Sequence, residues 1–286
     1  MQPAPTCAPV LVAFCPVAGR REALEFAVTA NRTGGGPIVA VAVVDDAAAV
    51  GHLGLERVRR TLDRVEVRVI EDEWPARGLA RALDELAPSL VVLGARRGPA
   101  RLGPTARRVL HVSACAVAIV PYGYMPPPAG LRAVGAAVAA GPEARRAIHA
   151  AAALVRAGGG GRLRVISAPE AGATAGAGTA AVHDAAALLA PGLAVDVEVL
   201  HGPPVESLVA ASERVDVLVM GSRASGPPGA VRLGTVSRAV LDRAVCPVLL
   251  VPRGAVVAPA RAHAEASSRS DDASGRGPGD RGTHLV

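Results

Sequence analysis

One pattern of strands and helices occurs twice in this chain, and the repetition limits the fold more than any other feature of the sequence. In each half, five short apolar runs alternate with stretches of helical length. Such alternation predicts βαβ units and a parallel sheet with helices on both faces. The expected strands are Val10–Phe14, Ile38–Val44, Val65–Ile70, Leu90–Leu93 and Ala116–Val120 in the first half, and Leu131–Val138, Leu163–Ile166, Val195–Leu200, Val217–Met220 and Val248–Val251 in the second.

The two halves also match locally. Ser89–Gly94 corresponds to Asp216–Gly221, 127 residues later, and Cys115–Pro121 corresponds to Cys246–Pro252, 131 residues later. The loop between these two strands is therefore four residues longer in the second half. The proline-rich segment Tyr122–Gly130 is interpreted as the linker between the copies.

These matches predict two domains, 8–122 and 130–253. A length of 286 residues suits two domains of ordinary size. Only 2% of the residues are aromatic whereas 50% are hydrophobic, so the cores must consist of Ala, Val and Leu. The remaining segment, 254–286, lacks apolar periodicity and is expected to be a disordered tail.

The charge of the chain is +6, which raises the question of nucleic-acid binding. Every basic residue is an arginine, a pattern that biased coding explains. The chain also has too few aromatic side chains to stack bases as single-strand binders do. We therefore expect no specific nucleic-acid partner.

The cysteines and histidines show no metal-ligand spacing, so no metal site is expected. Reduced thiols in apolar surroundings indicate a cytoplasmic protein. No apolar stretch free of charges reaches the roughly 18 residues of a membrane span, so no membrane association is expected. The four cysteines are Cys7, Cys15, Cys115 and Cys246.

The most informative motif is Val217–Leu241. A buried strand is expected to end at Gly221, a loop of glycine and proline follows, and a helix begins near Gly234 and Thr235. Glycines let backbone N–H groups approach an anion, and the first turn of a helix offers unpaired donors. In open α/β sheets, ligands bind at the carboxyl ends of the strands, where this motif lies.

The motif and the Cys-Pro-Val-Leu-Leu-Val-Pro run that follows it resemble the universal stress protein (UspA-like) family in its tandem form. The resemblance extends over nearly all of residues 8–253. It implies two open parallel five-stranded sheets of order 3-2-1-4-5, an adenine-nucleotide alpha-hydrolase-like fold. It also implies that the last strands, Ala116–Val120 and Val248–Val251, pair so that the halves form an internal pseudo-dimer. A homodimer and an unidentified protein partner stay open.

The resemblance further implies a site for ATP or another adenine nucleotide in the second copy. The family's nucleotide-binding pattern of three glycines and a hydroxyl residue aligns with Gly221, Ala224, Gly234 and Thr235. Alanine thus stands where the second glycine is usual. The aspartate that usually follows the first strand is replaced by Cys15 in the first copy and Ala139 in the second. The residues implied to surround the ribose and phosphates are Gly221, Ser222, Arg223, Gly234, Thr235, Val236 and Ser237.

The same site is expected to be lost in the first copy. Gly94 and Gly103 occupy the outer glycine positions, but the loop between them is four residues short. Pro104 stands where a hydroxyl residue belongs, and proline lacks the N–H that a phosphate requires.

Three functions remain for comparison. The first is a non-catalytic stress-response regulator that holds a nucleotide in its second domain. The second is a nucleotide-independent interaction module, in which Thr235 does no more than begin a helix. The third, a nucleotide-dependent enzyme, is disfavoured because no general base or nucleophile lies beside the loop. The acidic run Glu71–Glu73 is interpreted as a solvated loop that opens the next helix.

Overall fold

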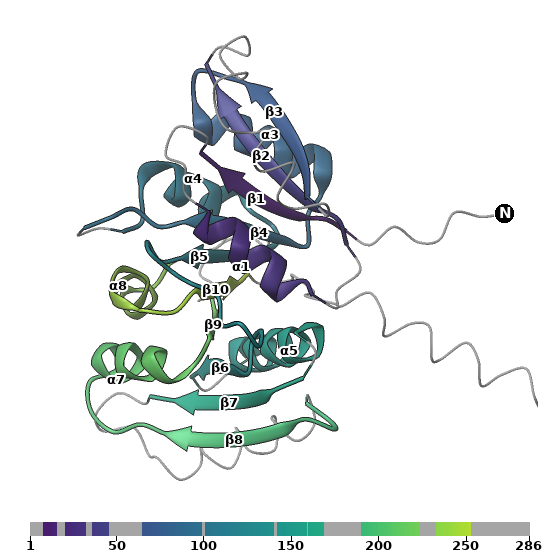
Figure 1. The fold of residues 1–286 in the computed structure, drawn as a ribbon. Helices are drawn as coiled ribbons and strands as arrows, with labels where there is room; N and C mark the ends of the chain where they lie inside the picture. The colour runs from purple at the N-terminus through teal and green to yellow at the C-terminus, as the bar shows by residue number, and fades with distance from the viewer. Residues whose placement is uncertain are drawn as a thin grey trace, which may run out of the picture.

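Ten strands form one continuous sheet in the computed structural model, which describes residues 8–15, 21–32, 36–45, 65–98, 101–139, 142–158, 160–168, 190–222 and 233–252. The strand order is β3-β2-β1-β4-β5-β10-β9-β6-β7-β8. Each copy thus contributes a five-stranded sheet of order 3-2-1-4-5, as predicted (Figure 1). The predicted tail lies outside the described residues.

The two copies share one succession of elements. The first comprises β1 (Val10–Phe14), α1 (Glu22–Ala30), β2 (Ile38–Val44), β3 (Val65–Glu71), α3 (Pro75–Leu86), β4 (Leu90–Gly94), α4 (Pro104–Val112) and β5 (Ala116–Val120). The second comprises β6 (Ala133–Val138), α5 (Pro142–Ala157), β7 (Arg162–Ser167), β8 (Ala194–Val199), α7 (Pro204–Ala211), the short helix η2 (Ser212–Arg214), β9 (Val217–Gly221), α8 (Thr235–Arg243) and β10 (Val248–Val251).

The copies meet through their last strands. β5 and β10 pair antiparallel, with Ile119 opposite Val248 and Val117 opposite Leu250, whereas every other pair of neighbours in the sheet is parallel. Both strands are buried, so neither leaves an apolar edge exposed. The docking expected of these strands is thus present in the structure.

Side-chain alternation along the strands builds two cores, one on each face of the sheet. Val10, Val12 and Phe14 of β1 belong to one cluster and Leu11 to the other, because successive side chains of a strand point to opposite faces. The first cluster includes residues of α1 and α5, and the second includes residues of α3, α4, α7 and α8. Each cluster contains residues of both copies, so the cores are continuous across the β5–β10 junction.

The segment between the copies is anchored on both sides. Tyr124 packs edge-to-face on Phe26 of α1, with ring centroids 6.0 Å apart. At the far end, the Asp216 carboxylate accepts hydrogen bonds from the backbone N–H groups of Arg132 (2.6 Å) and Ala133 (2.8 Å). The contacts of Asp216 hold the start of β6 beside the start of β9.

The acidic run Glu71–Glu73 matches its prediction only in part, since Glu71 and Glu73 are exposed but Asp72 is buried. Asp72 is 7% exposed and not solvated. Its carboxylate accepts hydrogen bonds from the N–H of Trp74 (2.8 Å) and from Arg77 (2.8 and 2.9 Å), and Arg81 lies 3.7 Å away. The hydrogen bond from Arg77 is the main reason that the pKa of Asp72 is lowered. Because the partners of Asp72 compensate its burial, its role is to fix the start of α3.

Candidate functional site

The carboxyl ends of the strands define one edge in each copy, and both candidate sites lie there. A parallel sheet places all its carboxyl ends at the same edge, and the helix after each strand begins there. β4 ends at Gly94 before α4, and β9 ends at Gly221 before α8. The two edges have the same topology but differ in the side chains and the open space beside them.

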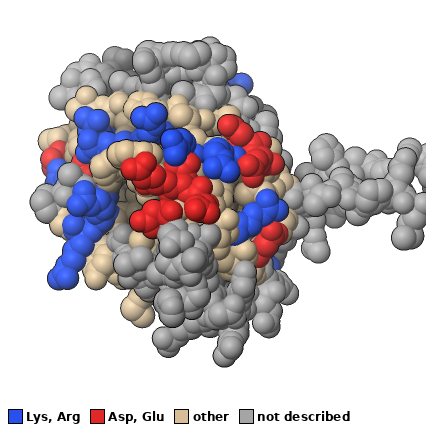
Figure 2. All heavy atoms as spheres, turned by 90° about the horizontal axis from the view of Figure 1, so that it is seen from above, with Lys and Arg blue, Asp and Glu red and all other residues tan. Residues whose placement is uncertain are grey.

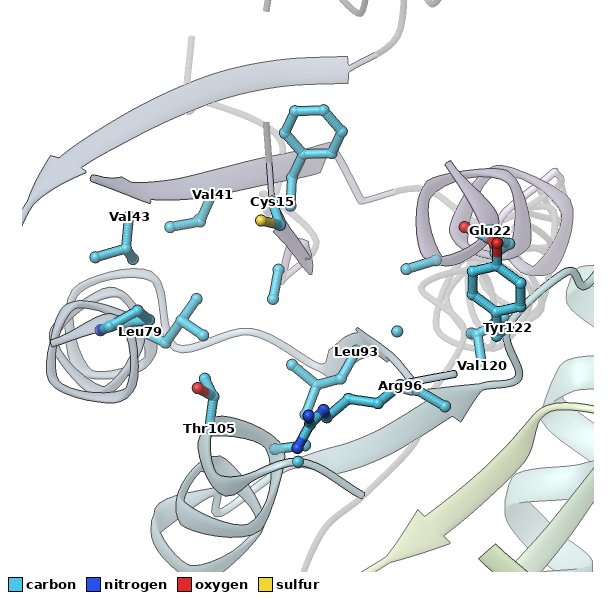
Figure 3. Close-up of a pocket in the computed structure, with 18 of the residues that line it drawn as sticks. Cys15, Glu22, Val41, Val43, Leu79, Leu93, Arg96, Thr105, Val120 and Tyr122 are labelled. Carbon is cyan, nitrogen blue, oxygen red and sulfur yellow. The ribbon is translucent and has the colours of Figure 1, made fainter. Parts of the chain in front are cut away.

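The first copy contains a cavity of about 400 Å³ at this edge (Figure 3). Valine and leucine side chains from β2, α3 and β4 form much of its wall, and Cys15 lies at the end of β1. A Cβ added at Gly94 would meet nothing within 4 Å, so the end of β4 borders open space. The cavity is notable because the sequence predicted that the nucleotide site of this copy is lost.

The corner of the cavity where a phosphate would bind is nevertheless closed. Gly103 is the N-cap of α4 and Pro104 is its first residue, which supplies no N–H. The aliphatic part of Arg96 lies across Gly103, since a Cβ built on that glycine would be 2.8 Å from Arg96 Cδ. Sequence reasoning missed Arg96, although the shortened loop that brings it there was visible in the spacing of the strands.

In the second copy, the predicted residues occupy the end of β9 and the start of α8. Arg223 lies outside the described residues, as does Ala224, so the structure brings only the two flanking groups to this edge. Thr235 is exposed, and Gly234 precedes α8 without a side-chain cap. The others are Gly221 and Val236, both half-buried, and Ser222 and Ser237, which are 3% and 7% exposed.

Ser222 provides the polar feature that fits a ligand. Its hydroxyl is buried and has no hydrogen-bond partner among the described residues, while its backbone N–H donates to Val251 O at 2.9 Å. A buried hydroxyl without a partner is costly, so a bound acceptor at this position would be stabilising. The N–H groups of the first turn of α8 have no acceptor within the helix. The residues present therefore fit an anionic group at this edge.

Gly221 is more crowded than its counterpart in the first copy. A Cβ added there would be 2.9 Å from the backbone oxygen of Glu143, in the first turn of α5. The cause lies in the chain between the first strand and first helix of each copy. Three residues separate β6 from α5, whereas seven separate β1 from α1. The shorter connection brings α5 over the end of β9.

Other kinds of site find less support within the described part of the chain. There, no group of three or more His, Cys, Asp or Glu residues could hold a metal ion. No described helix has both the length and the apolar character needed to cross a bilayer. On the face in Figure 2, arginines and acidic residues lie next to one another rather than in separate fields.

Sequence comparison finds the same repeat. The model of the universal stress protein family matches residues 47–121 and 130–252. The first match begins after β1, α1 and β2, which all contribute to the cavity, whereas the second includes the whole of the second copy's sheet. The universal stress protein in the QAH/OAS sulfhydrylase 3' region of Thermus aquaticus is 43% identical over 58 residues. That match spans 20% of this chain and 42% of the relative's length.

Solved structures share the architecture. A universal stress protein from Archaeoglobus fulgidus superposes with a TM-score of 0.63 at 21% identity, covering 86% of this chain and 96% of that one. A candidate universal stress protein from Pseudomonas aeruginosa gives 0.62 at 20% identity, covering 86% and 94%. At these identities the likeness shows the fold.

Proposed function

The chain belongs to the universal stress protein family, and from this premise we propose that it is a non-catalytic cytoplasmic regulator whose second copy binds ATP or another adenine nucleotide. We further propose that its domains are residues 8–122 and 130–253. The nucleotide would bind at the carboxyl edge of β9, between Gly221 and the first turn of α8.

The observation that carries this proposal is the hydroxyl of Ser222, which has no hydrogen-bond partner among the described residues. It is buried directly after β9, at the edge where α8 begins at Thr235. A phosphate oxygen would accept from this hydroxyl and from the first N–H groups of α8, whose dipole favours a negative charge. Arg223, which lies outside the described residues, is proposed to complete the charge balance.

A regulatory role without catalysis is supported by the titratable groups. Burial raises the pKa of Cys246 to about 12, so this thiol is a poor nucleophile. The buried carboxylate of Asp72 is engaged by two arginines and belongs to the first copy. In addition, the described cysteines are all free, which is in keeping with a reducing compartment.

The test uses one substitution at matched positions of the two copies. Gly234 and Gly103 precede their helices with nearly the same extended backbone, φ −71° ψ 168° and φ −68° ψ 169°. Aspartate is favoured at such a helix N-cap, so Gly234→Asp is expected to preserve folding while its carboxylate repels phosphate. ATP binding, measured by equilibrium dialysis, should fall at least tenfold in Gly234→Asp and stay unchanged in Gly103→Asp.

Circular dichroism melting of both variants checks that the fold persists. A second measurement uses protein purified without added ATP. The protein is denatured, and the adenine nucleotide that it releases is assayed. If wild-type protein binds no adenine nucleotide, or if Gly103→Asp alone abolishes binding, the proposed site is wrong. Thr235→Ala, at an exposed position, gives a milder variant that should weaken binding by about threefold through loss of one hydroxyl donor.

The nucleotide-independent interaction module is the second candidate, and the backbone of Glu143 favours it. Its oxygen lies close to Gly221 and narrows the space beside β9. If that space is too small for a nucleotide, ATP will neither bind nor raise the melting temperature of the wild-type protein.

A further inference from the structure

The cavity of the first copy has walls suited to an apolar molecule. Val41 and Val43 of β2, Leu79 of α3 and Leu93 of β4 face it (Figure 3). Its volume of about 400 Å³ falls in the range of small-molecule pockets, which are mostly apolar with a few placed polar groups. An adenine ring needs hydrogen-bond partners on its edge, and these four side chains provide none.

The polar side chains of this cavity leave one cation for a ligand. Arg96 extends from the end of β4 toward Thr105 and the first turn of α4 (Figure 3). Glu22, the first residue of α1, already has a partner in the linker between the copies. Its carboxylate accepts a hydrogen bond from the N–H of Gly123 at 3.0 Å. A single guanidinium at the rim matches one acidic group on a ligand.

A polyphosphate does not fit the same rim. The stem of Arg96 lies against Gly103, and Pro104 removes one of the N–H donors that a phosphate would use at the start of α4. The second copy lacks the proline, since Thr235 takes the place of Pro104, and no side chain among the described residues is seen to cover the start of α8. The cavity in the first copy therefore differs from the proposed nucleotide site in shape and in donors.

We propose that the first copy binds a compact apolar acid, such as a medium-chain carboxylic acid, with its hydrocarbon between β2, α3 and β4 and its acidic group on Arg96. This site is separate from the proposed nucleotide site, and neither depends on the other for its chemistry. The protein would then sense two ligands of different classes, one in each copy.

The chain carries its own reporter for this site. Trp74 is the only tryptophan, it is 60% exposed, and the next residue, Pro75, lines the cavity. Anilinonaphthalene sulfonate and N-phenylnaphthylamine share an apolar ring system, but only the first carries an acidic group. Energy transfer from Trp74 to either probe places it near the cavity, and displacement by decanoate tests the proposed class of ligand.

Two substitutions separate the charge from the volume. Arg96→Gln should weaken binding of the sulfonate about three- to tenfold and leave the neutral probe unchanged, since a partly exposed ion pair contributes modestly. Ala13→Phe fills the cavity from β1 and should abolish energy transfer to both probes. Arg108→Gln changes an exposed arginine on α4 away from the cavity lining and should have no effect.

Melting curves establish that each variant is folded, and Ala106→Leu replaces Ala13→Phe if that variant unfolds. Decanoate displacement of both probes from wild type, with loss of the sulfonate preference in Arg96→Gln, supports the site. Four results overturn it: no energy transfer in wild type, energy transfer retained in folded filled variants, no displacement by decanoate, or displacement by ATP that Gly234→Asp does not prevent.

Discussion

The two copies of this chain have the same strand order but differ at the edge where ligands bind. In the first, β4 ends at Gly94 beside an open cavity, and Arg96 covers the start of α4. In the second, β9 ends at Gly221 against the backbone of Glu143, and α8 begins without a covering side chain among the described residues. The contrast teaches that a duplicated sheet is preserved by its buried strands, while the connections after those strands diverge freely.

Thiol chemistry gives the largest expected contrast. Cys15 is exposed at the end of β1 in the first copy, whereas Cys246 is 5% exposed before β10 in the second. Burial raises the pKa of Cys246 to about 12, so at pH 8 only about one molecule in ten thousand carries its thiolate. Iodoacetamide should therefore label Cys15 at least about a thousandfold faster, as read by peptide mass spectrometry. Comparable rates in the native protein would show that β10 opens readily.

Glycine substitutions probe the crowding directly. Gly221→Ala places a methyl group 2.9 Å from Glu143 O and should lower the free energy of unfolding by about 1–3 kcal/mol. At the matching position, the methyl group of Gly94→Ala would have no atom within 4 Å. This variant should change the free energy of unfolding by less than about 0.5 kcal/mol. Urea denaturation of both variants measures the difference. Equal losses would mean that the two strand ends are equally packed.

The junction of the copies offers a smaller effect. Arg101, after β4 of the first copy, donates a hydrogen bond to the Ala244 backbone oxygen at the end of α8, with 2.6 Å between Nη1 and O. Arg101→Ala should lower the free energy of unfolding by about 1 kcal/mol, because this charged donor is only partly buried. Arg108→Ala is the matched control on an exposed part of α4. Chemical denaturation measures the difference. Equal free energies of unfolding for Arg101→Ala and Arg108→Ala would show that this contact does not stabilise the protein.

The smallest effect should come from the acid stability of the junction after β3 in the first copy. The hydrogen bond from Arg77 lowers the pKa of Asp72, so its stabilisation is present above the ordinary carboxyl pKa and is lost as pH falls through the lowered value. Asp72→Asn should therefore be less stable than wild type at neutral pH, with a difference that shrinks below about pH 4. Melting temperatures across this range check the sign, and a difference that grows in acid would contradict it. The corresponding junction of the second copy, after β8, is Leu200-His201-Gly202, which has no carboxylate to titrate.

Much of the fold was predictable because buried parallel strands read as short apolar runs. The predicted Val10–Phe14, Ile38–Val44, Ala116–Val120 and Val248–Val251 coincide with the observed strands. β6 begins at Ala133 and not at the predicted Leu131, which is fully buried yet precedes the strand. An apolar pattern reports burial, and it cannot distinguish a buried linker residue from the first residue of a strand.

The site was less predictable, since it depends on packing between segments distant in sequence. The motif correctly located the start of α8, but the approach of Glu143 to Gly221 follows from the length of a different connection. The cavity was missed because the loss of a phosphate-binding loop was taken as the loss of the whole pocket. Arg96 closes one corner only, and the apolar walls behind it persist.

Hydrogen–deuterium exchange with each ligand in turn tests the central claim, that the two copies bind different classes of ligand, most directly. ATP should protect backbone N–H groups around Ser222 and Thr235–Ser237, while decanoate should protect those around Ala95, Arg96 and Thr105. The two sets of protected peptides should not overlap. Protection of the same peptides by both ligands, or of first-copy peptides by ATP, would contradict the account.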